Sequence, residues 1–375
     1  MLARRLHVPY SIGLVFAGIG LALLPFSPNI ELTKQLVFTT FLPPLIFEAA
    51  IQLRWRELQK DLPVILVFAT VGVLFSAAAT AIGMHYLAQW TWISALVFGV
   101  LIAATDPVSV IATFKDAGVH GRIRLLVEAE SLFNDGTAAV GFTIALVFAS
   151  GQSIGIPGVT KTLAIMILGS LVCGAVVAGV MILLAGATDD HLVEITFTTI
   201  AAFGSFLLAE HLHLSGILAT LTAGLIIGNV GHLAISAEAH AAVEEFWEYA
   251  AFVANSLIFL LIGMRVAHRN YSFVVLPALI AIVLVTLGRA LAIYPLSLLF
   301  ARSALRISAK HQHILFWGGL RGALALALAL GLPPDMPARE EIITVAFAVV
   351  AFSIFVQGLT IKPLMRRLGE LSSDE

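Results

Sequence analysis

The chain has 375 residues, of which 59% are hydrophobic and only 12% are charged, and its formal net charge is −2. A soluble domain is about 25% charged, so this composition excludes a soluble globular protein and indicates a polytopic membrane protein. A net charge this close to zero gives no reason to expect a nucleic-acid partner.

Apolar runs of about the length that crosses a bilayer recur along the whole chain. We predict an all-α membrane protein with about twelve transmembrane helices, at residues 9–26, 33–53, 63–88, 92–114, 124–149, 158–187, 191–210, 215–229, 242–264, 273–301, 311–331 and 339–368. Several spans are shorter than the roughly 20 residues of a straight crossing. The shortest, at 215–229, is expected to be thin, tilted or partly re-entrant.

The basic residues predict the orientation. Of the 21 lysines and arginines, fourteen fall in loops on one side and five in loops on the other, while Arg289 and Arg321 fall inside spans. The positive-inside rule assigns the richer side to the cytoplasm. We therefore expect a multi-pass protein of the cell membrane, with both ends of the sequence as given in the cytoplasm.

Acidic residues inside the spans are costly and mark candidate functional sites. Glu48, in the second span, is expected either to guard an entrance to such a site or to pair near the interface. Further along, Asp106 precedes Pro107, which removes a backbone donor and pushes its predecessor out of helical geometry. We expect the helix to break near Thr105, with free carbonyls and the Asp106 carboxylate facing inward as a cation site requires. The alternative is a proline kink whose aspartate caps the second half-helix.

The next stretch, Glu-Ser-Leu-Phe-Asn-Asp-Gly at 130–136, opens an apolar segment. Ser131 and Asp135 are four residues apart and share a helix face, and Glu130 and Asn134 share the adjacent one. Asp135 and Ser131 offer an oxygen-lined site for a small monovalent cation, while Glu130 is better placed to be held by a buried arginine. A carboxylate that binds either Na⁺ or H⁺ at one place makes the two ions compete, which results in exchange.

A glycine-rich interruption is predicted in the second half of the chain. Trp-Gly-Gly-Leu-Arg-Gly-Ala at 317–323 holds three glycines around Arg321, and glycine loosens a helix interior by about 1 kcal/mol relative to alanine. We predict a second broken helix over 318–322, with close packing through small residues as the alternative. Two interrupted spans, one in each half, are typical of transporters with inverted repeats and crossed broken helices.

The number of titrating carboxylates bears on stoichiometry. The polar pair of the 130–136 stretch is Asn134-Asp135 rather than two aspartates. If an arginine neutralises Glu130, one carboxylate is left to alternate between proton and cation, which favours electroneutral one-for-one exchange by alternating access at Asp135. Asp106 is a second carboxylate nearby that could share this role.

Four motifs together resemble the monovalent cation:proton antiporters of the NhaP/NHE branch. They are Leu-Pro-Pro-Leu-Ile-Phe-Glu-Ala-Ala at 42–50, Ala-Thr-Asp-Pro-Val at 104–108, Glu-Ser-Leu-Phe-Asn-Asp-Gly at 130–136 and Gly-Gly-Leu-Arg-Gly-Ala at 318–323. They occur in the order of the family and span about 280 residues, so the family-level match is specific although each motif alone would be weak.

The resemblance implies a function and a set of site residues. It implies exchange of Na⁺ (or Li⁺) for H⁺, with Asp135 as the aspartate that binds both the cation and the proton. Asp106, Thr105 and Ser131 would complete or flank the Na⁺ site, and Glu48 matches a nearby acidic residue of the family.

The resemblance also assigns structural roles inside the membrane. Asn134 would hold the crossed helices together. Glu130 would form the core ion pair, with Arg321 as the first choice of partner and Arg289 as the competitor for that place.

As a fold, the resemblance implies one transmembrane antiporter domain over 1–375 that forms a homodimer in the lipid bilayer. Ion-translocating core helices would lie at about 92–187 and 273–368, and dimerisation-side helices at about 9–88 and 191–264. Family members usually have thirteen helices, the extra one preceding the segment that begins at Ala3. Either this chain lacks that helix, which usually belongs to the dimer-forming side, or its start has been placed too late.

Other functions remain open at this stage. K⁺/H⁺ exchange is the runner-up within the class, because the residues give ligands but not the size of the cavity. A cation channel is less favoured, because no repeated filter loop or ring of charge is evident. An intramembrane hydrolase would need a serine, histidine or metal cluster inside the bilayer. We expect no enzymatic activity and no cofactor, only the transported Na⁺ (or Li⁺ or K⁺) and H⁺.

Overall fold

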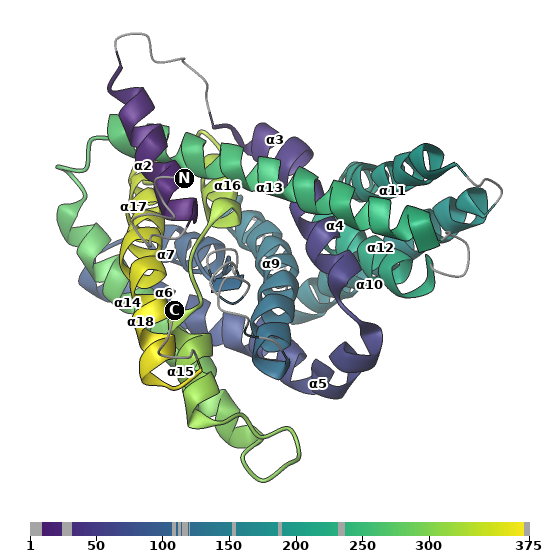
Figure 1. Cartoon of the computed structure of the whole chain (residues 1–375). Coiled ribbons are helices and arrows are strands. Elements are labelled where there is room, and N and C mark those ends of the chain that lie inside the picture. The colour runs from purple at the N-terminus through teal and green to yellow at the C-terminus, as the bar shows by residue number, and fades with distance from the viewer. Residues whose placement is uncertain are drawn as a thin grey trace. The chain divides into compact units, whose positions relative to one another are not determined.

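A computed structural model of the chain describes residues 10–24, 32–106, 121–151, 155–186, 190–231 and 237–370, together with 110, 111, 114 and 119. In this described part the regular secondary structure is helical (Figure 1). An isolated antiparallel backbone bridge joins Asp106 to Leu320. The predicted all-α membrane fold is thus confirmed.

The helices of the first half are α2 (Tyr10–Ala22), α3 (Lys34–Leu36), α4 (Leu42–Gln52), α5 (Trp55–Val67), α6 (Val73–Leu87), α7 (Trp92–Leu101), α9 (Arg122–Ala149) and α10 (Ile156–Ala185). Those of the second half are α11 (His191–His211), α12 (Gly216–Val230), α13 (Ala237–His268), α14 (Val275–Leu299), α15 (Ala309–Trp317), α16 (Ala323–Leu330), α17 (Arg339–Phe352) and α18 (Gly358–Arg367). Each predicted span overlaps one of these helices or consecutive ones, and the part of the 92–114 span after Asp106 lies mostly outside the described residues.

Among the described residues, seven helical runs are long and apolar enough to cross a membrane: Trp55–Leu87, Arg122–Ala149, Ile156–Ala185, His191–His211, Ala241–His268, Val275–Leu299 and Arg339–Arg367. Three further apolar helices, α2, α7 and α12, are shorter. The short span predicted at 215–229 is therefore a short helix, α12. The two other predicted spans, 33–53 and 311–331, fall on shorter helices: α3 and α4 in the first, and α15 and α16 in the second.

In the part of the chain that the structure describes, three spans contain a π-helical turn, in which the backbone is locally widened. These turns are Val37–Phe41, Phe68–Gly72 and Ser353–Gln357. Such turns are rare and often lie at functional sites because they redirect the side chains of one helix face. The third turn supplies Ser353 to the site described below.

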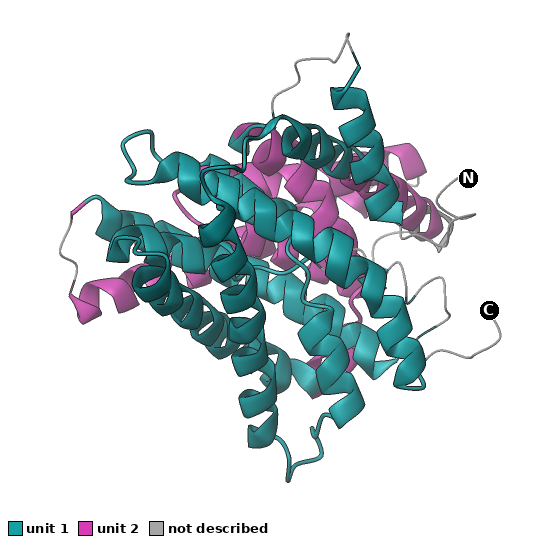
Figure 2. Ribbon diagram, turned by 90° about the vertical axis from the view of Figure 1, so that its left-hand side faces the viewer, with its two compact units in different colours: residues 1–34, 61–150, 256–375 teal, residues 35–60, 151–255 magenta. Residues whose placement is uncertain are grey.

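The chain divides into two compact units, which Figure 2 draws in different colours. Unit 1 comprises residues 1–34, 61–150 and 256–375, and unit 2 comprises residues 35–60 and 151–255. Each unit therefore combines segments that are far apart in the sequence. The assignment of 92–187 and 273–368 to an ion-translocating core stays a prediction.

Unit 2 is built on close packing between α12 and its neighbours α4, α10 and α11. Gly224 and Gly228 lie one turn apart on α12, and a side chain at either position would overlap α4 at Ala50 or Ile51. Small residues at this spacing let two helix backbones approach closely in a membrane. At the end of the same unit, the Trp247 indole N–H donates to Thr198 Oγ1 at 2.9 Å, which satisfies both buried polar groups.

Unit 1 contains both predicted interruptions. Its helices α6, α7, α9 and α14 pack on one another, and α17 packs on α14 and α16. Within this bundle α7 ends at Leu101, and the segment between α15 and α16 covers residues 318–322. The fold therefore places two non-helical backbone segments inside a helical unit.

Candidate functional site

The two interrupted segments meet in unit 1. The Asp106 N–H donates to the Leu320 carbonyl at 2.8 Å, so the chain after α7 crosses the chain between α15 and α16. Both predicted breaks are present. The first begins at residue 102, a few residues earlier than the break expected near Thr105, and Pro107, on which that prediction rested, lies outside the described residues.

Glycines make this close crossing possible. A Cβ atom at Gly322 would overlap the Asp106 carboxylate, and one at Gly319 would overlap the Arg289 guanidinium. The glycines of 318–322 thus allow charged side chains to approach the backbone directly. The predicted helix break over 318–322 is therefore accompanied by close approach at its small residues, here of side chains to non-helical backbone.

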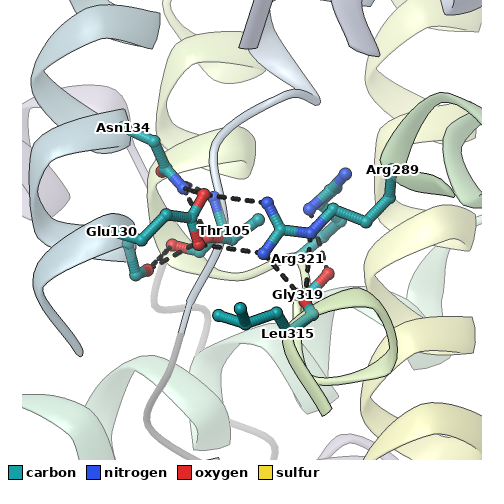
Figure 3. Close-up of polar contacts among 8 residues, drawn as sticks. Thr105, Glu130, Asn134, Arg289, Leu315, Gly319 and Arg321 are labelled. Atoms are coloured by element: carbon teal, nitrogen blue, oxygen red, sulfur yellow. Dashed lines mark hydrogen bonds and ion pairs between the residues drawn. The ribbon is translucent and has the colours of Figure 1, made fainter. Parts of the chain in front are cut away.

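Asn134 and Ser131 of α9 fix the first interrupted segment, and Figure 3 shows Asn134 beside Thr105. The Asn134 side-chain carbonyl accepts from the Thr105 N–H at 3.0 Å, and its amide donates to Thr105 Oγ1 at 2.6 Å. The Ser131 hydroxyl donates to the Thr105 carbonyl at 2.5 Å and accepts from Thr105 Oγ1 at 3.1 Å. All three residues are buried. Asn134 and Ser131 therefore satisfy the N–H and the carbonyl of Thr105, which the broken helix leaves without helical partners.

Glu130 forms a two-pronged ion pair with Arg289, shown in Figure 3. Arg289 Nη1 lies 2.8 Å from Glu130 Oε1, and Nη2 lies 2.9 Å from Oε2. Both side chains are less than 10% exposed, and the Asn134 amide donates to the same carboxylate at 3.0 Å. Paired, planar contacts of this kind are the strongest that arginine makes with a carboxylate.

This pairing corrects the first-choice expectation that Glu130 pairs with Arg321. The physical reason is where the two arginines sit. Arg289 projects from α14 and also donates to the Leu315 carbonyl at 2.9 Å, near the carboxyl end of α15, where a cation is favoured. Arg321 belongs to the interruption itself, and its Nη1 donates to the Gly319 carbonyl at 2.9 Å.

Ser353 is a site residue that the sequence reasoning missed. Its hydroxyl accepts from the Arg321 N–H at 3.0 Å and lies 3.0 Å from the Arg321 carbonyl, to which it can donate. It thus serves both backbone groups of one residue in the second interruption. A serine in the apolar run 349–356 carries little signal on its own, and the π-helical turn that presents it is not visible in a hydrophobic pattern.

Asp135 follows Asn134 on α9 and differs from it in one respect. Its Oδ1 atom is buried and accepts no hydrogen bond in the described part of the chain. The charges that act on it most are those of Asp106 and Glu130, both negative. A carboxylate oxygen that is buried without a donor makes the bare anion costly, and a bound proton or cation would remove that cost.

Glu48, the remaining predicted site residue, lies on α4 in unit 2, where it accepts from the Gln52 side chain at 2.5 Å. The other eight predicted residues all belong to unit 1: Thr105, Asp106, Glu130, Ser131, Asn134, Asp135, Arg289 and Arg321. Within unit 1, hydrogen bonds and ion pairs connect Thr105, Ser131, Asn134, Glu130 and Arg289 into one cluster.

A half-buried carboxylate with one buried, unsatisfied oxygen, beside two crossed, interrupted helices, defines a class of protein. Backbone that leaves helical geometry inside a membrane protein is tolerated where it is buried in protein or lines a cavity. Together with an unsatisfied intramembrane carboxylate, it is the arrangement of ion-coupled secondary transporters.

The chain belongs to the sodium/hydrogen exchanger family, since the family model described as "Sodium/hydrogen exchanger, transmembrane" matches residues 1–367. It is 38% identical over 374 residues to the Na⁺/H⁺ antiporter ApNhaP of Aphanothece halophytica, a match that covers 97% of this chain and 70% of that protein. It is 34% identical to the Na⁺/H⁺ antiporter NhaH of Halobacillus aidingensis, covering 98% of this chain and 94% of that protein. The family resemblance read from the four motifs is thus confirmed.

A solved structure shares the fold. The sodium proton antiporter MjNhaP1 of Methanocaldococcus jannaschii superposes with a TM-score of 0.79, covering 100% of this chain and 95% of that chain at 18% identity. The chain is therefore a multi-pass membrane protein with the fold of that antiporter.

Removing the Glu130 charge is expected to destabilise unit 1. Glu130→Gln leaves the Arg289 guanidinium buried without its counter-charge, which costs about 3–5 kcal/mol. The change is measured as the melting temperature of the detergent-purified protein. Glu128→Gln is the matched control, because its partner Arg124 lies 3.7 Å away and is 26% exposed. Equal losses in the two variants would contradict a special role for the Glu130–Arg289 pair.

Adding one methyl group at the crossing is expected to destabilise it. Gly322→Ala forces the Asp106 carboxylate aside, and overpacking of this kind costs about 1–3 kcal/mol. Gly331→Ala is the control, because its Cβ would meet the flexible Lys34 side chain, which can move away. Thermal unfolding of both variants tests this, and an unchanged melting temperature in Gly322→Ala would show that the crossing is looser than described.

Proposed function

We propose that this chain is a secondary antiporter, and not an enzyme, which exchanges Na⁺ (or Li⁺) for H⁺ by alternating access at Asp135. The observation that carries the proposal is the buried Asp135 Oδ1 atom, which lacks a hydrogen-bond donor in the described part of the chain. Family membership supports it, as do relatives that are themselves named Na⁺/H⁺ antiporters. One carboxylate that takes either a proton or a cation couples the two fluxes by competition.

The neighbours of Asp135 suit a small, hard cation. The Thr105 and Ser131 hydroxyls and the Asp106 carboxylate are oxygen ligands, which Na⁺ and Li⁺ prefer over nitrogen or sulfur. We propose that they complete or flank the cation site, and that Glu48 acts at an entrance to it. The transported ions would then be the only small molecules that the protein binds for its activity, without a resident cofactor.

The charge balance of unit 1 supports electroneutral exchange. The buried or half-buried acids of the crossing region are Asp106, Glu130 and Asp135, and the buried bases are Arg289 and Arg321. Three negative and two positive charges leave one negative charge, which a single Na⁺ or a single H⁺ neutralises. Both loaded forms then carry the same charge, so one-for-one exchange moves no net charge.

Two further features belong to this proposal. By analogy with the transporter class, an ion-carrying part of the chain would move against a dimerisation part in a homodimer. The excess of basic residues on one side favours a cell-membrane protein whose ends, as given, lie in the cytoplasm. K⁺/H⁺ exchange by the same fold is the second candidate, because oxygen ligands also bind K⁺ and do not by themselves determine the size of the cavity.

Neutralising Asp135 is expected to abolish exchange. Asp135→Asn keeps the size of the side chain but cannot release a proton or supply a negative ligand. The measurement is dye-reported ΔpH in proteoliposomes after addition of Na⁺, Li⁺ or K⁺ in turn. Asp335→Asn, the same replacement at an exposed loop position, should behave as wild type. Equal signals from wild type and Asp135→Asn would refute Asp135 as the carrier, and the ion that gives the signal decides between Na⁺ and K⁺ exchange.

Membrane voltage is expected to leave the exchange equilibrium unchanged. The balance point, where opposing Na⁺ and H⁺ gradients give no net flux, is measured in proteoliposomes with and without a potential set by K⁺ and valinomycin. Movement of one net charge per cycle would shift that point by about 2.3 kcal/mol, or roughly 50-fold in a concentration ratio, per 100 mV. A shift of this size would replace one-for-one exchange by a two-proton cycle.

A further inference from the structure

An aromatic groove lies in unit 1 between α14, α15 and α18, and none of the candidate ion-site residues lines it. Its volume is about 370 Å³. Figure 1 shows α15 and α18 beside each other, and the two helices are in contact. The groove is therefore a separate feature of the molecule that the exchange mechanism does not use.

The walls of the groove are mostly rings. Tyr294 of α14 packs on Phe316 of α15 with centroids 5.4 Å apart, and Phe316 packs on Trp317 at 5.8 Å. His313, one turn earlier on α15, lies 5.6 Å from the Tyr294 ring. The groove surface is thus largely apolar, and flat rings of this kind suit a hydrocarbon chain.

Hydrogen bonds hold these rings in place. The Tyr294 hydroxyl lies 2.8 Å from His313 Nδ1, and the Trp317 indole N–H donates to Thr360 Oγ1 of α18 at 2.8 Å. Because the Tyr294 hydroxyl, His313 Nδ1 and the Trp317 indole N–H already have partners, these rings are held in place before anything binds. Tyr and Trp with one wet and one apolar end are characteristic of the level where lipid headgroups meet acyl chains.

One edge of the groove is positively charged. Arg367 lines it and is exposed, and no ion pair with another described residue neutralises it. The chain around this end of α15 and α18 is also basic. Six lysines or arginines and a single acidic residue, Glu370, lie within residues 301–318 and 358–370. This end belongs to the side that the positive-inside rule assigns to the cytoplasm, and the inner leaflet is rich in anionic lipid.

We propose that this groove binds an anionic phospholipid, with its phosphate against Arg367 and an acyl chain along Tyr294, Phe316 and Trp317. The charge of Arg367 selects an anion, and the apolar rings select a molecule with a hydrocarbon chain. Basic pockets between helices at the cytoplasmic side are a known physical solution for holding such headgroups. A free phosphate ion would use the arginine but leave the rings uncovered.

The position of the groove links it to the crossing. Trp317 is the last residue of α15 and directly precedes the interruption at 318–322. The Leu315 carbonyl of the same helix is held by Arg289. A lipid in the groove therefore rests on the half-helix that leads into the ion site. The lipid proposal itself does not depend on the proposed transport activity, because binding is measured without transport.

Trp317 supplies a direct probe of occupancy. The full chain is reconstituted in phosphatidylcholine vesicles with increasing shares of phosphatidylglycerol that carries bromine on its acyl chain, which quenches nearby tryptophan fluorescence. The difference between wild type and Trp317→Phe isolates the signal of Trp317 from that of the other four tryptophans. Brominated phosphatidylcholine gives the reference for a neutral headgroup.

We expect Trp317 to prefer phosphatidylglycerol over phosphatidylcholine by about fivefold, the effect of one basic residue near an anionic headgroup. Arg367→Gln should remove the preference, and Arg367→Lys should retain most of it. Arg366→Gln is the matched control: it removes the same charge from the adjacent position, outside the groove lining, and should leave the preference intact.

Three results would overturn the proposal. The first is equal quenching by the two lipids in wild type. The second is an equal loss of preference in Arg366→Gln and Arg367→Gln, which would indicate a diffuse surface charge instead of a site. The third is displacement of the brominated phosphatidylglycerol by millimolar inorganic phosphate, which would assign the arginine to a free anion.

Discussion

The structure of unit 1 depends on satisfying backbone groups where two helices are interrupted inside an apolar protein. An unpaired N–H or carbonyl in such surroundings costs several kcal/mol. The Thr105 N–H donates to the Asn134 side chain, and the Asp106 N–H donates to the Leu320 carbonyl. The Ser353 hydroxyl contacts both backbone groups of Arg321. These partners come from α9, from the second interruption and from the π-helical turn after α17. The crossing is thus held by partners from several elements of unit 1.

The two acidic residues of α9 near the crossing, Glu130 and Asp135, differ in their partners. Glu130 and Arg289 are paired and hydrogen-bonded, so the Glu130 carboxylate has a stable counter-charge without a bound proton or cation. Asp135 lies beside them on α9 with a buried oxygen that no described donor reaches. A low-dielectric interior makes the first arrangement strong and the second costly as a bare anion. This contrast supports the proposal that Glu130 is structural and that Asp135 binds the ion.

Much of this could be predicted from the sequence, because the strongest signals are local. Apolar runs gave the spans, and a charged residue within a run marked Asp135 and Glu130 as candidates. The choice between Arg289 and Arg321 as the partner of Glu130 could not be made, because both lie in spans and the pairing depends on how α9, α14 and α15 rotate against one another. Ser353 could not be found either, since its role comes from a local widening of the helix that no hydrophobic pattern records.

The link between Asn134 and Asp135 constrains how access to the site can change. Asn134 is fully buried and holds Thr105, and the next residue in each segment is an aspartate, Asp135 on α9 and Asp106 on the interrupted chain. The two carboxylates are thus attached to one hydrogen-bonded group of residues. Ser131, one helical turn before Asp135, adds a hydrogen bond to the Thr105 carbonyl. Pulling them apart would break several buried hydrogen bonds at about 1 kcal/mol each, and more where a buried group is left unpaired. In the proposed alternating access, other parts of the chain are therefore expected to move relative to these residues, while Asp106 and Asp135 stay together.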